Sequence, residues 1–200
     1  MTDTQDTQET PDTPENARHF ARTAQLESWL EQHHADRTGL WLKIAKRDSG
    51  VESVSASEVI DSALCFGWID GQRKSFDAVY YLQRITPRRR RSAWSLINVE
   101  KVGELTGAGR MRPAGLAEVE AARSDGRWAV AYPSQSRATV PDDLVAALAA
   151  DDAARVFFDR LSRSDRYLVL LRLMTATTPE VRAARLQKAV ASMAAGRKVR

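Results

Sequence analysis

The chain has 200 residues, of which 43% are hydrophobic and 28% are charged, and its formal net charge at pH 7 is +4. This composition suits a soluble globular chain of about one domain, and no apolar run reaches the roughly 18 residues that span a bilayer. Because Cys65 is the single cysteine and the three histidines lack the spacing of metal ligands, an internal disulfide and a cysteine-rich metal site are excluded. With no signal-like segment at its start, we expect a cytoplasmic protein without a cofactor.

The first 16 residues alternate threonine and glutamine with acids and include two prolines. Such a composition buries too little apolar surface to offset the entropy of ordering, so residues 1–16 are predicted to be a disordered acidic tail. The tail carries −5, which leaves +9 on the remainder against the overall +4. A basic body favours anionic partners, although a basic surface kept for solubility is the simpler explanation. The acids of the tail are Asp3, Asp6, Glu9, Asp12 and Glu15.

The next segment predicts a helix followed by a strand. After Thr23, a predicted N-cap, apolar side chains recur at helical spacing up to a stop before Gly39. Residues 40–46 alternate apolar and other side chains, which is typical of a strand. The helical stripe consists of Leu26, Trp29, Leu30 and His33.

A second helix and a hairpin are predicted next. Ser55 and Glu58 form a capping-box pattern, and the helix that follows stops at Gly67. Asp70-Gly71 reads as a turn, and residues 72–76 and 79–85 read as paired strands. With the strand at 40–46, they predict a small antiparallel sheet of about three strands.

The rest of the chain is predicted to be helical. Helices are expected from about Ser92 or Trp94 to Gly107, from Pro113 to Ser124, and over 142–149, 152–161, 165–174 and 179–195. The fold class is therefore α+β, with an all-helical C-terminal region. We expect a tail at 1–16, an α+β core domain at 17–133 that carries the site, and a helical region at 134–200.

The stretch 62–98 concentrates polar and aromatic residues beyond what solubility requires. A run of four arginines, 88–91, follows the hairpin and precedes a Trp-Ser-Asn face. Guanidinium groups bind phosphate and carboxylate bidentately, so this stretch predicts a site for an anion. The predicted ligand-binding residues are Trp68, Asp70, Arg88, Ser92, Trp94, Ser95 and Asn98.

Each of these residues also has a purely structural explanation. The two tryptophans suit a core or a pocket wall. Asp70 either holds a turn or orients Arg88 through a bidentate hydrogen bond. Ser95 and Asn98 share a helix face, where they either cap the helix or present donors to an anion. The arginine run is by default a solvated face.

Five short motifs follow one another along the chain. They are 67–71 (Gly-Trp-Ile-Asp-Gly), 86–88 (Thr-Pro-Arg), 92–95 (Ser-Ala-Trp-Ser) with Asn98, 109–115 (Gly-Arg-Met-Arg-Pro-Ala-Gly) and 126–128 (Gly-Arg-Trp). In this order they resemble the bacterial YdeI/OmpD-associated proteins over about residues 17–198. The resemblance implies a role in protection against bacteriocins or cationic peptides and association with an outer-membrane porin, and it implies no reaction or catalytic residue.

Three functions follow from these observations. The preferred one is a non-enzymatic cytoplasmic binding protein that recognises an anionic small molecule or an acidic partner surface. The alternatives are an enzyme that acts on a small phosphorylated or carboxylated substrate in the same pocket, and a nucleic-acid binder that uses the arginine run. No catalytic residue is identified. Cys65 lies in the last turn of a predicted helix between apolar neighbours, so we expect it to be buried and inert.

Overall fold

The computed structural model describes residues 12–199. The chain forms two compact units, and each is described here by itself. The first unit comprises the residues up to 90 together with 104–118, and the second comprises 91–103 together with 119–200. No helix between residues 12 and 199 is both long and apolar enough to cross a lipid bilayer.

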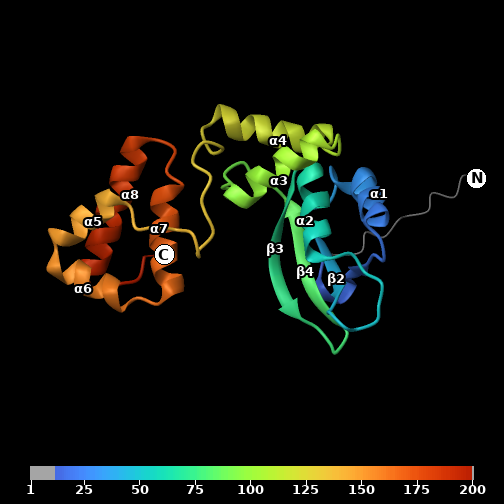
Figure 1. Cartoon of the computed structure of the whole chain (residues 1–200), viewed down its shortest axis with the longest axis horizontal. Helices are drawn as coiled ribbons and strands as arrows, with labels where there is room; N and C mark the ends of the chain where they lie inside the picture. Colours follow the sequence, from blue (N-terminus) through green and yellow to red (C-terminus); the bar gives the residue numbers. More distant parts are fainter. Residues whose placement is uncertain (1–11, 200) are drawn as a thin grey trace, which may run out of the picture. The chain divides into compact units, whose positions relative to one another are not determined.

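The first unit is built on a four-stranded sheet with the order β1-β2-β4-β3 (Figure 1). Strands β2 (Leu40–Ala45), β4 (Tyr80–Pro87) and β3 (Trp68–Ser75) pair antiparallel, as predicted. The prediction of about three antiparallel strands is wrong for the whole sheet, because β1 (Arg18–His19) adds a fourth strand parallel to β2. Two residues are too short to show the alternation by which a strand is recognised.

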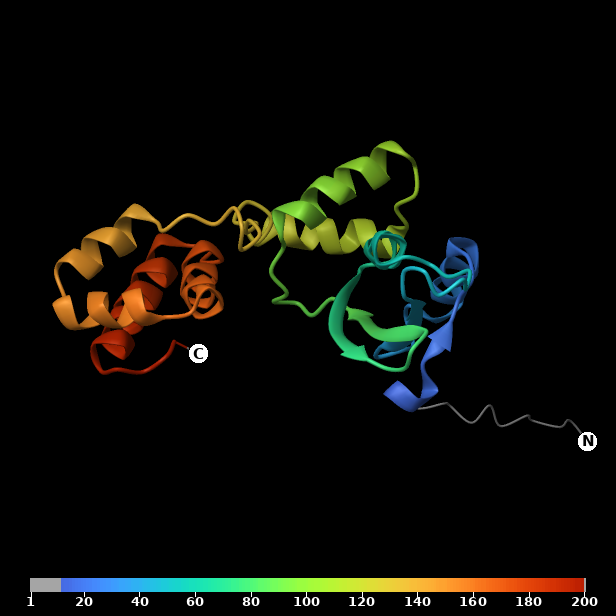
Figure 2. The ribbon, with the colours of Figure 1, turned by 60° about the horizontal axis from the view of Figure 1, so that its bottom comes forward.

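Two helices cover one face of this sheet. Helix α2 (Ala56–Cys65) packs on β3 and β4 and against α1 (Thr23–His33), as Figure 2 shows from a second side. Leu26, Leu30 and Val59 of these helices are completely buried. They form the core with alternate residues of the strands, namely Leu40, Leu42, Ile44 and Ile85.

The local signals for α2 and for the hairpin turn are confirmed. The Ser55 hydroxyl accepts a hydrogen bond from the Glu58 N–H, and the Glu58 carboxylate accepts one from the Ser55 N–H. At the hairpin turn, the Asp77 carboxylate accepts hydrogen bonds from the backbone N–H groups of Val79 and Tyr80. These side-chain acceptors satisfy backbone donors that the helix and the ladder leave unpaired.

Two boundaries differ from the prediction. Arg22 rather than Thr23 is the N-cap of α1. Asp70-Gly71 is not a turn but lies inside β3, where the pairing with β4 shifts register between Asp70 and Arg73. Such a bulge inserts an extra residue without ending the strand, so a turn-like dipeptide is compatible with it.

Part of the predicted disordered tail has a defined structure. Pro14–Asn16 form a 3-10 turn, and the Asp12 carboxylate is paired with the Arg84 guanidinium on β4. For residues 12–16 the structure therefore differs from the expected disorder, because a tertiary ion pair holds a segment that composition alone leaves unstructured. Residues 1–11 lie outside the described part.

Two glycines of the first unit allow helix α4 (Pro113–Ser124) to begin against the end of α2. A Cβ at Gly115 would overlap the carbonyl oxygen of Cys65 and lie 2.7 Å from that of Leu64. Gly67 has a positive φ of 75°, and a Cβ there would lie 2.9 Å from the Ala114 oxygen. Only a residue without a side chain fits either position.

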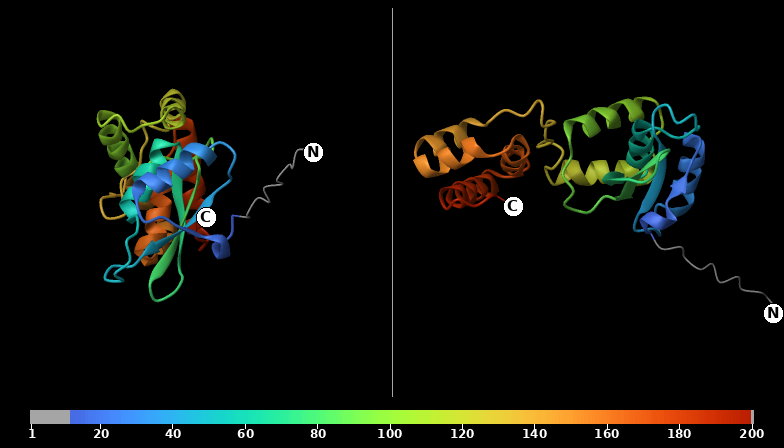
Figure 3. Two further views of the ribbon diagram at one scale, coloured as in Figure 1. Left: turned by 90° about the vertical axis from the view of Figure 1, so that its right-hand side faces the viewer. Right: turned by 90° about the horizontal axis from the view of Figure 1, so that it is seen from below.

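The second unit contains the helical C-terminal region, as predicted. Four helices enclose one apolar core, namely α5 (Asp142–Ala149), α6 (Asp152–Arg160), α7 (Arg163–Met174) and α8 (Pro179–Ala194). The ribbons of these helices are orange to red in Figure 3. Helix α3 (Leu96–Gly107) and α4 each run from one unit into the other. The residues at the centre of the core are Leu144, Phe158, Leu173 and Met193.

Gly115→Ala should lower the stability of the chain. A methyl group at this position would collide with backbone carbonyl oxygens that cannot rotate away, and overpacking of this kind costs about 1–3 kcal/mol. For a chain of this length, each kcal/mol corresponds to a fall in Tm of about 2–4 °C. Gly103→Ala in α3 is the matched control, because its Cβ meets nothing within 4 Å and alanine favours helix. Equal melting temperatures for the two variants would contradict the steric explanation.

Candidate functional site

Trp68 is a core residue of the first unit. Its side chain is 1% exposed, its indole Nε1 donates a hydrogen bond to the His34 carbonyl at 3.1 Å, and its ring meets that of Trp29 edge-on. A buried indole with a satisfied N–H is fully explained by packing. Trp68 nevertheless lies beside the start of the arginine run, since it pairs with Pro87, and the Arg88 N–H donates to the Gly67 carbonyl.

The four arginines of the run are not equivalent. Arg88 is 6% exposed, whereas Arg89, Arg90 and Arg91 are exposed. Burying a guanidinium costs free energy unless its surroundings compensate, so Arg88 differs physically from its three neighbours. Arg88 is therefore a buried cation, whereas the three arginines after it form a solvated basic patch.

Asp70 is exposed on β3, where it pairs with Ile85 of β4. That its carboxylate orients Arg88 stays a prediction. The alternative in which Asp70 simply holds a turn is wrong, because the residue lies inside a strand. Asp70 is left as an exposed acid at the bulge of β3.

The predicted residues after the arginine run gather in the second unit around Tyr132. The backbone N–H of Tyr132 donates to the Trp94 carbonyl, and that of Leu96 donates to the Tyr132 carbonyl. The Ser95 hydroxyl accepts a hydrogen bond from the Asn98 N–H at 3.2 Å, so it caps α3. Capping therefore accounts for Ser95.

The motif at 126–128 packs against the same segment. The rings of Trp94 and Trp128 lie 4.9 Å apart, and the buried Arg127 donates from Nη1 to the Ser92 carbonyl at 3.0 Å. Asp125 holds the Arg127 side chain through an ion pair of 2.7 Å. Two motifs that are about 30 residues apart thus form one cluster in the second unit.

The seven predicted residues fall in both units. Trp68, Asp70 and Arg88 belong to the first, and Ser92, Trp94, Ser95 and Asn98 belong to the second. Within each unit the structure brings neighbouring members together through backbone pairing. That all seven form one ligand pocket stays a prediction.

The motif at 109–115 attaches the start of α4 to α1 within the first unit. Arg110 donates to the Glu27 carboxylate at 2.7 Å, and this hydrogen bond raises the pKa of the guanidinium. Arg112 lies 3.5 Å from the Glu31 carboxylate and over the Phe66 ring. Sequence reasoning did not assign these contacts, because nothing in the sequence indicates that Glu27 and Glu31 face this motif. A hollow of about 410 Å³ lies beside these pairs.

Arginines of α8 secure the C-terminal end of α7. Arg182 forms a bidentate pair with Asp143 of α5 at 2.7 and 2.9 Å and donates to the Leu173 carbonyl. Arg185 donates to the Arg172 carbonyl and to the Thr175 hydroxyl. The last carbonyls of a helix lack intrahelical partners, so these two arginines are used inside the helical region.

Comparisons with known families divide the chain in a similar way. Residues 18–118 match the model of a domain of unknown function, DUF8412. The chain belongs to the DUF8412 family. Residues 137–196 match the model described as bacteriocin-protection, YdeI or OmpD-associated.

The second match confirms the YdeI/OmpD-associated resemblance over residues 137–196 and not over the whole stretch from 17 to 198. It falls on α5 to α8, whereas the five motifs that suggested the family all lie before residue 129. We call residues 137–196 the YdeI/OmpD-associated segment. No curated protein and no solved structure matches the chain.

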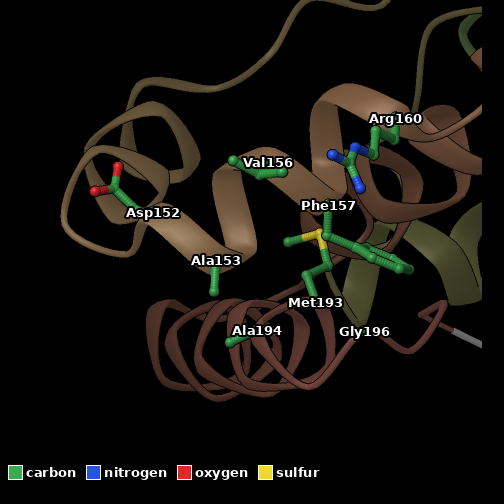
Figure 4. A pocket seen from close by; sticks show the side chains of 8 residues that line it. All are labelled: Asp152, Ala153, Val156, Phe157, Arg160, Met193, Ala194 and Gly196. Carbon is green, nitrogen blue, oxygen red and sulfur yellow. The ribbon is translucent and has the colours of Figure 1, made fainter.

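The YdeI/OmpD-associated segment borders two hollows. One, of about 440 Å³, lies between α6 and the end of α8, where Ala153 faces Ala194 and Phe157 lies beside Met193 (Figure 4). The other, of about 200 Å³, has a basic rim of Arg163 and Arg166. Its remaining lining residues are Gln135, Ser136, Ala138, Val140, Phe158, Tyr167 and Leu170. Among the described residues, no group of acids, histidines and cysteine is arranged to hold a metal ion.

Cys65 is buried, as predicted, and native protein should resist alkylation. Burial raises the pKa of its thiol, the Arg110 charge lowers it by a smaller amount and the Glu27 charge raises it, so the reactive thiolate is scarce at neutral pH. Iodoacetamide should label the native protein at least about tenfold more slowly than the urea-unfolded chain, as followed by mass spectrometry. Labelling of the folded protein faster than a free thiol would contradict this and favour the enzyme alternative.

The Asp143–Arg182 pair should stabilise the YdeI/OmpD-associated segment above about pH 4. The Arg182 hydrogen bond lowers the pKa of Asp143 in the folded state, so the contribution is present above the unfolded pKa and is lost as the pH falls through the folded pKa. Both side chains are about one third exposed, which limits the pair to about 1 kcal/mol.

Asp143→Asn should therefore lower Tm by about 2–4 °C at pH 7, and the difference from wild type should shrink below about pH 4. Thermal melts across this pH range provide the measurement. Asp152→Asn, at an exposed acid that pairs with the exposed Arg155, is the control. A difference that is independent of pH would assign the loss to packing instead.

Proposed function

We propose that this protein is a non-enzymatic binding protein of the YdeI/OmpD-associated type that recognises an anionic ligand or an acidic partner. The YdeI/OmpD-associated segment supports the family assignment. The proposed role is protection against bacteriocins or cationic peptides, which rests on the description of that family, and the proposed location is the cytoplasm. The proposed anion site centres on Arg88 of the first unit.

The burial of Arg88 is the observation that carries the anion proposal. A guanidinium that is fixed at the end of a hairpin loses little entropy on binding, and its planar fork matches phosphate or carboxylate. Its backbone N–H donates a hydrogen bond to the Gly67 carbonyl, and Trp68, which pairs with the preceding Pro87, is buried in the core. The exposed Arg89, Arg90 and Arg91 would add long-range attraction rather than a defined contact.

Neither alternative has comparable support. An enzyme would need an activated nucleophile or a paired acid and base, and burial disfavours the nucleophile that the sequence offers, because it raises the pKa of Cys65. A nucleic-acid binder that uses the arginine run would need these arginines to act as one surface, whereas Arg88 is buried. Both alternatives remain outcomes of the experiment that follows.

A ligand screen should identify an anion that stabilises the protein. Phosphate, pyrophosphate, citrate and a short oligonucleotide serve as probes, and a ligand that binds only the folded chain raises Tm by mass action. Arg88→Lys keeps the charge but removes the bidentate fork, so the Kd for the stabilising probe should rise about tenfold or more in calorimetry, which is about 1.4 kcal/mol.

Arg90→Lys is the matched control, because it makes the same change on an exposed arginine and should alter Kd less than twofold. Circular dichroism melts establish that both variants are folded. Equal losses for the two variants would replace the positioned site by a diffuse basic patch. A screen in which no probe raises Tm would contradict the anion proposal itself.

A further inference from the structure

The hollow with Arg163 and Arg166 on its rim adjoins another hollow of the second unit. This other hollow, of about 340 Å³, is lined by Ser134, Gln135, Ser136 and Arg163. Because the two hollows share three lining residues, we treat them as one and call it the α7 hollow. Its size falls in the range of about 300–1,000 Å³ that is usual for small-molecule sites.

One wall of the α7 hollow is a loop that hydrogen bonds hold in place. The N–H groups of Arg137 and Ala138 both donate to the Ser134 carbonyl, at 2.9 and 3.0 Å. The Tyr167 hydroxyl of α7 donates to the Pro133 carbonyl at 2.8 Å, which ties the loop to the helix. A wall that is already ordered loses little entropy when a ligand binds.

Part of the lining of the α7 hollow is apolar. Phe158 of α6 and Leu170 of α7 belong to the helical core and also line the hollow. Val140 lines it as well and is 40% exposed. Apolar walls combined with a few polar groups are typical of a site for a small organic molecule.

Arg166 is positioned by two contacts and keeps unused donors. Its Nη2 donates to the Asp159 carbonyl, and its guanidinium lies 5.4 Å from the centroid of the Phe158 ring. Within residues 12–199, its Nη1 has no acceptor, and its Nε is buried without one. A guanidinium that is held in this way can bind an oxyanion through the N–H groups of Nη1.

The charge of the α7 hollow is positive. Of the described residues that line it, two are arginines and none is an acid. The exposed Arg163 forms no hydrogen bond or ion pair through its side chain in the described part of the chain. Asp165, an acid of the same helical turn, is already paired with Lys198 at 2.8 Å and accepts a hydrogen bond from the Ser162 hydroxyl.

Two guanidinium groups match a phosphate group better than a carboxylate. A phosphate group carries about −1.5 to −2 charge at pH 7 and has three acceptor oxygens, whereas a carboxylate carries a single charge. Arg163 and Arg166 are three positions apart on α7, so they lie on the same face of the helix. Both can therefore reach one phosphate group.

We propose that the α7 hollow binds the phosphate group of a small organic monoester. In this site Arg163 and Arg166 bind the phosphate oxygens, and the organic part of the ligand lies against Phe158 and Val140. The site lies in the second unit, whereas the proposed Arg88 site lies in the first. Neither site depends on the other.

Phenylglyoxal, which modifies accessible arginine side chains, tests the proposal on the full wild-type chain. Phenyl phosphate is the probe, at about 10 mM, which fills most of a site whose Kd is about 1 mM. The modification of Arg163 should then slow at least about threefold, as followed by mass spectrometry, because the bound phosphate covers its guanidinium. Arg160, an exposed arginine of α6, should react at an unchanged rate when sodium chloride matches the ionic strength.

Calorimetry with variants provides a second measurement. The titrations use the Arg88→Lys background, in which the proposed site of the first unit is weakened. Arg163→Gln should raise the Kd for phenyl phosphate at least about fivefold, because it removes one of the two cations. Arg160→Gln is the matched control, which removes the same charge three residues away and should change Kd less than about twofold. Circular dichroism melts establish that both variants are folded.

Inorganic phosphate at the same concentration tests the apolar part of the site. It should protect Arg163 less than phenyl phosphate does, because it buries no apolar surface. Equal protection by the two probes would overturn the assignment to an organic monoester. The phosphate site itself would be overturned if Arg163 were not protected, if Arg160 were protected equally, or if the two variants lost the same affinity.

Discussion

The close contact between the end of α2 and the start of α4 is the constraint on which the first unit depends. Gly67 and Gly115 allow backbone to meet backbone there, and the Arg112 N–H donates to the Cys65 carbonyl across the contact. A backbone contact cannot be relieved by a change of rotamer, so it fixes the direction in which α4 leaves the sheet. The Arg110–Glu27 pair then ties the same segment to α1. Two of the motifs that first suggested a family are thus explained by packing.

The basic residues of this protein have three different physical uses. Some are internal ties, such as Arg182, which joins α5, α7 and α8 of the YdeI/OmpD-associated segment. Others lie over aromatic rings, as Lys74 lies over Trp41. The third group lies on the surface in contact with solvent, as Arg90 does, in contrast to the buried Arg88 two positions before it. Net charge therefore says little about binding, because a cation already used in an internal contact is not available to a partner.

The family matches change where function is sought in the chain. The sequence motifs direct attention to the stretch 62–98, which lies in the part that matches a domain of unknown function. The family model whose description mentions bacteriocin protection matches the YdeI/OmpD-associated segment instead. Arg163 and Arg166 of this segment line the α7 hollow. In this helical region some charged side chains, such as Arg182 and Arg185, form hydrogen bonds between helices. Such residues are spread along the sequence and do not form a short motif that can be recognised. A recognisable motif and a recognisable family segment need not coincide.

The sequence by itself determined the elements that local chemistry specifies. The capping box at Ser55, the stop at Gly67 and the four C-terminal helices all depend on groups within a few residues of one another, and each lies within a few residues of its predicted position. Only the tertiary structure decided which residues meet across the chain. It placed β1 in the sheet, buried Arg88 but not the three arginines after it, and bound Asp12 to Arg84. These outcomes depend on contacts between distant positions, which spacing and propensity do not encode.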